Sequence, residues 1–220
     1  MPGYGAVDTQ FRAYRAAFRR EAQRLGMFVA LYRYLHERRH DRLDELNLAP
    51  AFFQTVLTAL RSGIVIWSHK FLVGGSRQEV SMGTFLKFAG QNLVIFSTEA
   101  FRARRGLPED AWQVRRHIAP DAEAVRLDRR RLAGLTALPS LRVLRDKFHA
   151  HFDPQYFVQP EELDEAAPLT WGELTEIRRV IEDILNRYSV AFDGDHFVFD
   201  PLNQLDIEHV IEALREYRER

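Results

Sequence analysis

The sequence predicts an all-α protein, a helical bundle of six to eight helices that forms a single domain over residues 1–220. Three observations predict this class. Apolar residues recur at three- and four-residue steps, proline and glycine separate these segments, and no repeat, low-complexity tract or linker divides the chain. Because 46% of its residues are hydrophobic, the chain can bury a sizeable core. We expect this core over about residues 8–190, followed by a turn and a helix over residues 193–220.

Two long helices are predicted in the first third of the chain. Asp8 or Thr9 can cap the first helix, which runs to about Arg38 on a stripe of aromatic and aliphatic side chains. Pro50 suits the first turn of the second helix, because a proline there gives up only an N–H that has no partner inside the helix. This second helix runs to about Leu72 and is apolar over a wide face, so we expect it to lie centrally.

Glycine divides the middle of the chain. Residues 73–80 contain a Gly-Gly-Ser sequence and predict a loop. Residues 81–88 and 92–105 predict two shorter helices around Gly90, and Gly106 ends the second of them.

Residues 121–138 predict a strongly charged helix, which Pro139 interrupts. Because proline can start a new turn, we expect another helix from Ser140 to about Phe152. Residues 153–168 contain several prolines and carboxylates and predict a surface loop.

The last third of the chain predicts two further helices. Residues 170–173, Thr-Trp-Gly-Glu, form a capping box, in which the Thr and Glu side chains each bind a backbone N–H at the helix start. The helix that they open is expected to run to about Tyr188. Asp193 and Gly194 predict a turn, residues 197–199 a short extended piece, and residues 206–217 a last helix.

The composition limits the kinds of partner. The 31 basic and 31 acidic side chains cancel, so a nucleic-acid surface has to be a local patch. The basic run at residues 129–131 is one candidate for RNA, although a solvated helix face explains it as well. Arg61, His69 and Lys87 interrupt the longest apolar runs, so no membrane span is expected.

The chain is expected to be cytoplasmic and to need no cofactor. It contains no Cys, which excludes disulfides and Cys-based zinc sites and suits a reducing compartment. Residues 74–76, Gly-Gly-Ser, lack the Lys that a phosphate-binding loop requires. His36 and His40 have a metal-ligand spacing on a helix, but the two arginines at residues 38–39 disfavour a cation between them, and we expect no metal.

Residues 145–153, Arg-Asp-Lys-Phe-His-Ala-His-Phe-Asp, carry the most concentrated chemistry in the chain. A guanidinium stays charged at any usable pH, whereas an imidazole titrates close to neutrality. One group can therefore hold a phosphate while the other moves a proton, which makes them a plausible ribonuclease pair.

A helical wheel places these residues. The apolar stripe of this helix holds Leu141, Leu144, Phe148 and His151. Arg145 lies at the edge of the stripe and Asp146 on the side toward solvent. Because Arg145 and His151 are about 120° apart on this wheel, they can share a ligand only if the helix ends or bends near Ala150. An Arg and a His at a helix end can also be simple partners of the helix macrodipole.

The same nine residues resemble the signature of HEPN domains, in particular the abortive-infection AbiU-type branch, whose pattern is close to R-D-K-x-x-A-H-x-D. All fixed positions are present, namely Arg145, Asp146, Lys147, Ala150, His151 and Asp153. The wider HEPN motif is an Arg and a His separated by four to six residues. The pair Arg145 and His151 fits this spacing, while Arg145 and His149 are too close.

The resemblance implies a HEPN-like helical bundle and a metal-independent endoribonuclease that leaves a 2′,3′-cyclic phosphate. His151 would act as general base and Arg145 would bind the scissile phosphate. Supporting roles are implied for the neighbours Arg142, Asp146, Lys147, His149 and Asp153. HEPN domains commonly form homodimers that bring two such motifs to one cleft. Some HEPN toxins also carry a regulatory Tyr two residues after the His, where this chain has Asp153.

Three kinds of function stay open from the sequence. The first is a ribonuclease toxin or phage-defence effector, with RNA as substrate and an antitoxin or another defence protein as partner. The second is a catalytically inactive HEPN module that binds RNA or a protein. The third is a helical interaction protein with no role in nucleic-acid binding.

Overall fold

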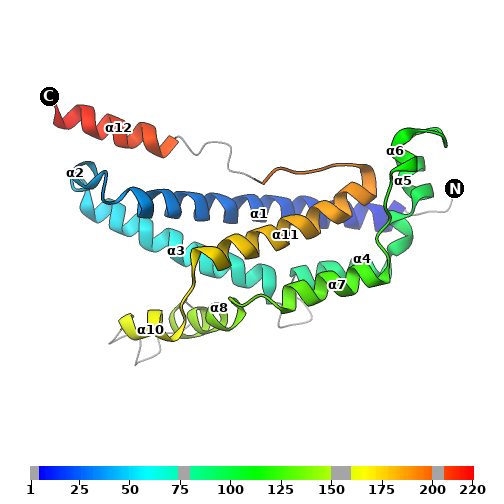
Figure 1. Cartoon of the computed structure of the whole chain (residues 1–220), viewed down its shortest axis with the longest axis horizontal. Coiled ribbons are helices and arrows are strands. Elements are labelled where there is room, and N and C mark those ends of the chain that lie inside the picture. The colour runs from blue at the N-terminus through cyan, green and yellow to red at the C-terminus, as the bar shows by residue number, and fades with distance from the viewer. Residues whose placement is uncertain (1–4, 74–79, 150–159, 200–205) are drawn as a thin grey trace.

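The computed structural model describes residues 5–73, 80–149, 160–199 and 206–220, and every regular element in these ranges is a helix (Figure 1). The all-α bundle predicted from the sequence is therefore confirmed. Residues 197–199, expected to be extended, belong to no strand and follow the last turn of a helix as irregular chain.

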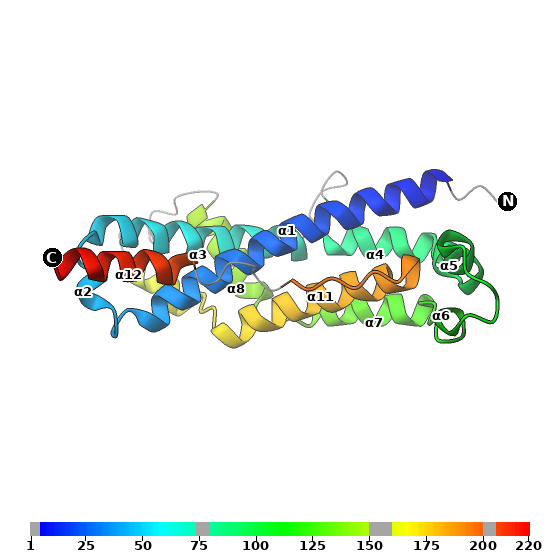
Figure 2. The same cartoon turned by 90° about the horizontal axis from the view of Figure 1, so that it is seen from above.

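Three long helices form the spine of an elongated molecule (Figures 1 and 2). They are α1 (Gly5–Arg38), α3 (Pro50–Leu72) and α11 (Trp171–Asp193). With 34 residues, α1 is about 50 Å long at the usual rise per residue. Both α3 and α11 pack along it. Pro50 lies in the first turn of α3, as the sequence predicted.

The predicted cap of α1 was wrong. The helix begins at Gly5, so Asp8 and Thr9 lie inside its first turns. The Thr9 hydroxyl donates to the carbonyl of Gly5, and the Asp8 carboxylate accepts hydrogen bonds from Arg104. The Asp8 side chain, which the sequence predicted to cap the helix, therefore binds Arg104, a residue distant in the sequence.

The predicted helix over residues 92–105 is divided in two. After α4 (Met82–Gln91) comes the short 3-10 helix η1 (Leu93–Phe96), and α5 (Thr98–Arg105) follows. Ser97 adopts an extended conformation between them, and its hydroxyl accepts a hydrogen bond from the backbone N–H of Ala100. This local cap starts a new helix where apolar periodicity alone suggested one continuous helix. Gly106 ends α5 with a positive φ, as predicted.

The short helix α6 (Trp112–Arg115) was not predicted. The charged helix α7 (Ala122–Ala133) begins after the N-cap Asp121 but ends at Gly134, several residues before the expected end at Leu138. Glycine favours an end to the helix because it loses more conformational freedom than other residues when it is fixed in a helix.

Part of the expected loop over residues 153–168 is also helical. The helix α10 (Pro160–Ala166) begins at a proline, which fits a first helical turn. The capping box at Thr170 and Glu173 is confirmed, but α11 continues past Tyr188 to Asp193. It stops there because Gly194 takes the left-handed conformation, with a φ of 84°, that favours glycine.

The last helix, α12 (Asp206–Arg218), has the predicted bounds to within a residue and packs beside the short α2 (Leu43–Leu46). Arg42 holds it through Glu208 and Glu212, at 2.6 Å and 2.9 Å. Ile211 is fully buried in a small apolar cluster with residues of α1 and α3. Ion pairs and apolar packing together thus fasten α12 to one end of the spine.

The main core is rich in phenylalanine. Rings from α1, α4, η1 and α11 meet edge to face and at tilted angles, among them Phe11, Phe85, Phe96 and Phe192. Asp128 on α7 is fully buried beside them and accepts a hydrogen bond from the Tyr188 hydroxyl. Burial raises the pKa of the Asp128 carboxyl, although Arg187 and Arg131 act in the opposite direction.

The helix α3 is long and apolar enough to cross a membrane by length and composition alone. Arg61 and His69, the residues from which no membrane span was expected, both lie within this helix. In the structure α3 packs against α1, α4 and α8, and a single helix of this kind is weak evidence for a membrane span.

Candidate functional site

The helix α8 (Leu138–Leu144) leads directly into the Arg145–Asp153 motif. Pro139 lies in its first turn, so the helix starts at the interruption that the sequence predicted. Leu141 and Leu144 are buried, as the wheel indicated, and they anchor α8 against α3. The helix before the motif is therefore attached to the core by apolar contacts.

The α-helix gives way at Arg145, earlier than the predicted bend near Ala150. Residues 145–149 form the π-helical turn η2 (Arg145–His149), which packs against α3. Each π-turn fits an extra residue into the helix and so changes which side chains share a face. The wheel that separates Arg145 from His151 by about 120° assumed α-helical geometry throughout, and it no longer applies at this turn.

Arg145 is accessible to a ligand. Its side chain is 43% exposed, and its guanidinium pairs with the carboxylate of the next residue, Asp146, which is 48% exposed. An ion pair in water contributes little to stability, so a phosphate can replace the carboxylate at small cost. Arg142 and Lys147, three residues before and two residues after Arg145, are also exposed.

The other half of the motif is not described. His151 and Asp153 lie outside the described residues, and for His149 only the backbone is described. The pairing of Arg145 with His151 thus stays a prediction, as does the supporting role of Asp153.

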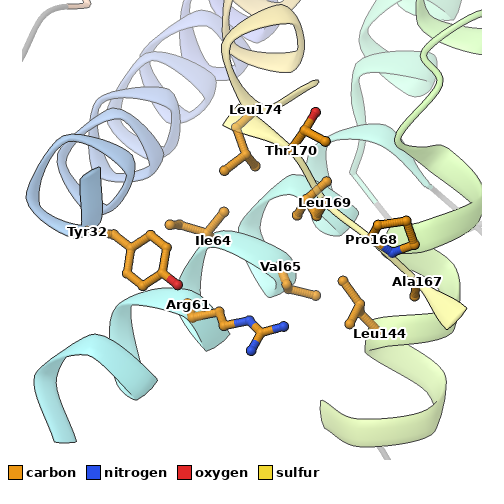
Figure 3. Close-up of a pocket in the computed structure, with 10 residues that line it drawn as sticks. All are labelled: Tyr32, Arg61, Ile64, Val65, Leu144, Ala167, Pro168, Leu169, Thr170 and Leu174. Carbon is orange, nitrogen blue, oxygen red and sulfur yellow. The ribbon is translucent and has the colours of Figure 1, made fainter. Parts of the chain in front are cut away.

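A pocket of about 330 Å³ lies next to the start of the motif. It is bounded by α1, α3, α8 and residues 167–170, which lead into α11 (Figure 3). Figure 3 shows the Arg61 guanidinium reaching from α3 toward Leu144, with the Tyr32 hydroxyl turned toward Arg61. The rest of the lining is mainly aliphatic, so a few polar groups stand in an apolar pocket, as in many ligand sites.

The rim of this pocket is held by the capping box of α11. The Thr170 N–H donates to the Glu173 carboxylate at 2.9 Å, and the Glu173 N–H donates back to the Thr170 hydroxyl. The backbone hydrogen bond from Thr170 lowers the pKa of Glu173 despite partial burial, so the carboxylate is charged at neutral pH. This charged cap fixes the pocket wall.

Two other candidates from the sequence, the basic run and a metal site, lie on residues that the structure describes. In the basic run at residues 129–131, Arg130 pairs with Glu123 at 2.8 Å and Arg131 with Asp183 at 2.6 Å. These ion pairs support the solvated-face interpretation. Within the part of the chain that the structure describes, no three His, Asp or Glu side chains come close enough to hold a metal ion.

Sequence reasoning missed the residues that build the pocket. Arg61 was considered only as an interruption of an apolar run, Tyr32 only as part of a helical stripe, and Thr170 only as a cap. They are far apart in the chain, and no local pattern connects them. Tyr32 and Arg61 can be recognised as lining one pocket only when the packing of α1 against α3 is known.

Comparison with known proteins gives a single kind of match. The model of the HEPN_AbiU2 family, described as AbiU2, matches residues 8–213, nearly the whole chain. Neither the curated proteins nor the solved structures contain a match to this sequence.

Proposed function

The chain belongs to the HEPN_AbiU2 family, an abortive-infection phage-defence family, and we propose that it acts as a metal-independent endoribonuclease. The observation that carries this proposal is Arg145, with its guanidinium exposed at a helix break, six residues before His151 in the sequence. A permanently charged group that can bind a phosphate and an imidazole that can move a proton are the minimum equipment for cleaving RNA.

The proposed reaction is a transesterification within the RNA. The His151 imidazole takes the proton from a ribose 2′-hydroxyl, and the 2′-oxygen forms a bond to phosphorus. The bond to the 5′-oxygen breaks, and that oxygen takes up a proton and leaves as a hydroxyl. The products are a 2′,3′-cyclic phosphate and a 5′-hydroxyl end. Arg145 offsets the charge that develops on the phosphoryl oxygens.

Neighbouring groups have supporting roles in this scheme. Arg142 and Lys147 are exposed beside Arg145 and can bind adjacent phosphates of the RNA backbone. We assign His149 the same role, and Asp153 the orientation of the His151 imidazole. Asp146 pairs with Arg145 in the free protein and gives way to the scissile phosphate when RNA binds.

We further propose a homodimer in which two Arg145–His151 motifs face one cleft. Mixing Arg145→Ala protein with His151→Ala protein tests this arrangement. If a cleft takes Arg145 from one protomer and His151 from the other, the mixture regains part of the cleavage that both variants lack. A monomeric mass by light scattering at micromolar concentration would contradict the dimer.

The decisive experiment is cleavage of single-stranded RNA in excess EDTA. We expect the wild-type protein to cleave RNA, to leave DNA of the same sequence intact, and to leave cyclic phosphate ends that mass spectrometry detects. We expect His151→Ala to abolish cleavage, while His209→Ala, at an exposed position on α12, keeps it. A wild-type protein that binds many RNAs and cleaves none would instead support the catalytically inactive module.

The proposed role in defence predicts toxicity that depends on the same residue. Expression of the wild-type protein should arrest growth, and expression of His151→Ala should not. An antitoxin or another defence protein is the partner that we expect to restrain it. If both proteins are equally harmless even when RNA cleavage is observed in vitro, the toxin role is wrong although the chemistry holds.

A further inference from the structure

Three aromatic side chains meet at Tyr32, which lines the pocket described above. Tyr32 and His36 lie one turn apart on α1, and Trp171 is the first residue of α11. The ring centroids are 5.4 Å apart for Tyr32 and Trp171 and 5.9 Å apart for His36 and Trp171. All three side chains are only partly buried. The cluster therefore presents ring surface to solvent at the edge of the bundle.

The cluster continues into positive charge. A guanidinium nitrogen of Arg39 lies 3.4 Å from His36 Nε2, and another lies 3.3 Å from His40 Nε2. In the described ranges Arg39 forms no ion pair with a carboxylate, whereas the nearby Arg33 pairs with Glu37 at 2.7 Å. Arg39 is exposed, so its charge is available to an anion from outside.

The same cluster also continues toward the motif. Tyr32 belongs both to the aromatic cluster and to the wall of the pocket, and Leu144 lines the opposite side of the pocket. Leu144 immediately precedes Arg145. One surface thus leads from an exposed cation, over aromatic rings, into an apolar pocket whose wall includes the residue before Arg145.

Aromatic faces beside cations are the chemistry that recognises unpaired nucleotides. Bases of single-stranded RNA stack on aromatic rings, while arginine binds the phosphates between them. Bases in a duplex are stacked on one another and cannot reach such rings. The pocket volume of about 330 Å³ lies at the small end of ligand sites, which suits one base better than a folded RNA element.

We propose that Tyr32, His36 and Trp171 form a stacking site for bases of single-stranded RNA, with Arg39 on a neighbouring phosphate. The site holds the substrate a short distance from the bond that is cleaved. This inference rests on the proposed RNA substrate, and it adds binding residues from α1 and α11 that lie outside the Arg145–Asp153 motif.

Binding is measured in the His151→Ala background, so that the RNA stays intact. The probe is a single-stranded RNA of about 12 nucleotides that contains 2-aminopurine, a base whose fluorescence falls when it stacks. We expect quenching on binding and an affinity about ten- to a hundredfold weaker after Trp171→Ala. Trp171→Phe keeps a ring and should keep most of the affinity. Trp112→Ala removes an exposed tryptophan on α6 and should change nothing.

A second pair of variants avoids any effect on folding. Arg39→Ala should weaken binding and lower the salt dependence of the affinity by about one charge. The matched control is Arg105→Ala, which removes another exposed arginine, on α5. Thermal unfolding of each variant separates a loss of binding from a loss of structure.

The outcomes separate this inference from the proposed function. If the wild-type protein cleaves RNA and neither Trp171→Ala nor Arg39→Ala weakens binding, the stacking site is wrong and the ribonuclease stands. If RNA is bound with quenching that depends on Trp171 but is never cleaved, the stacking site stands and the ribonuclease is wrong. A protein that binds no RNA refutes both.

Discussion

Two arginines of this protein have opposite environments. Arg104 on α5 is 9% exposed, donates to both Asp8 carboxylate oxygens and to the Ile95 and Phe192 carbonyls, and lies 3.6 Å above the Phe192 ring. Arg145 after α8 is 43% exposed and pairs with the next residue, Asp146. The Arg104 guanidinium joins three parts of the fold. Among the described residues, the Arg145 guanidinium pairs with one carboxylate, which is exposed to solvent.

The difference teaches how to tell a structural arginine from one that can bind a ligand. Four of the five N–H groups of the Arg104 guanidinium donate to the protein itself, so a phosphate would have to displace buried partners. The partner of Arg145 is exposed, and an exposed ion pair contributes only about 0–1 kcal/mol. Sequence composition cannot make this distinction in a chain with 31 basic residues.

The largest expected effect is on catalysis. Arg145→Ala should lower the rate of RNA cleavage by about 10²- to 10³-fold, because the phosphoryl charge loses its fixed partner. The free energy of unfolding should change by less than about 0.5 kcal/mol, since the side chain is exposed. Single-turnover cleavage and urea unfolding measure the two quantities. Unfolding of this variant at much lower urea would mean that Arg145 is structural, and the comparison would fail.

The next effect is on stability. Arg104→Ala should lower the free energy of unfolding by about 2–3 kcal/mol, because it leaves Asp8 and two carbonyls without their donor. Arg105→Ala, at the exposed neighbouring position, should cost less than about 0.5 kcal/mol. Urea unfolding followed by circular dichroism compares them. If the two variants were equally stable, Arg104 would not be more important to the fold than an exposed arginine, and the comparison would fail.

The smallest effect concerns the partner of Arg145. Asp146→Asn removes the carboxylate that competes with the phosphate for the guanidinium, so RNA should bind up to about fivefold more tightly. Fluorescence anisotropy in the His151→Ala background measures this change. A weaker affinity would show instead that the Asp146 carboxylate helps to hold Arg145 in place for RNA binding.

Much of the fold could be predicted because its signals are local. Pro50 starts α3, the Thr170 and Glu173 pair starts α11, and Gly106 and Gly194 end their helices. Each of these features depends on side chains within one helical turn, so a short stretch of sequence contains the cause.

Other boundaries depended on competition between local signals. The hydroxyl of Ser97 divides a segment whose apolar periodicity is continuous, and Gly134 ends α7 before the interruption at Pro139 that the sequence predicted. At Arg145 the α-helix becomes a π-turn where the sequence predicted α-helix as far as Phe152. Packing of this turn on α3 is a contact that the helical wheel does not contain.

The sequence by itself determined the all-α class, the main caps and the motif from Arg145 to Asp153, because periodicity, capping and spacing are properties of neighbouring residues. Only the tertiary structure decided which arginines are bound within the protein and which surfaces lie next to the motif. The partners of Arg104 lie 96 and 88 residues away in the chain, and Trp171 meets Tyr32 across two helices. Such contacts arise from packing between helices, which a one-dimensional pattern does not encode.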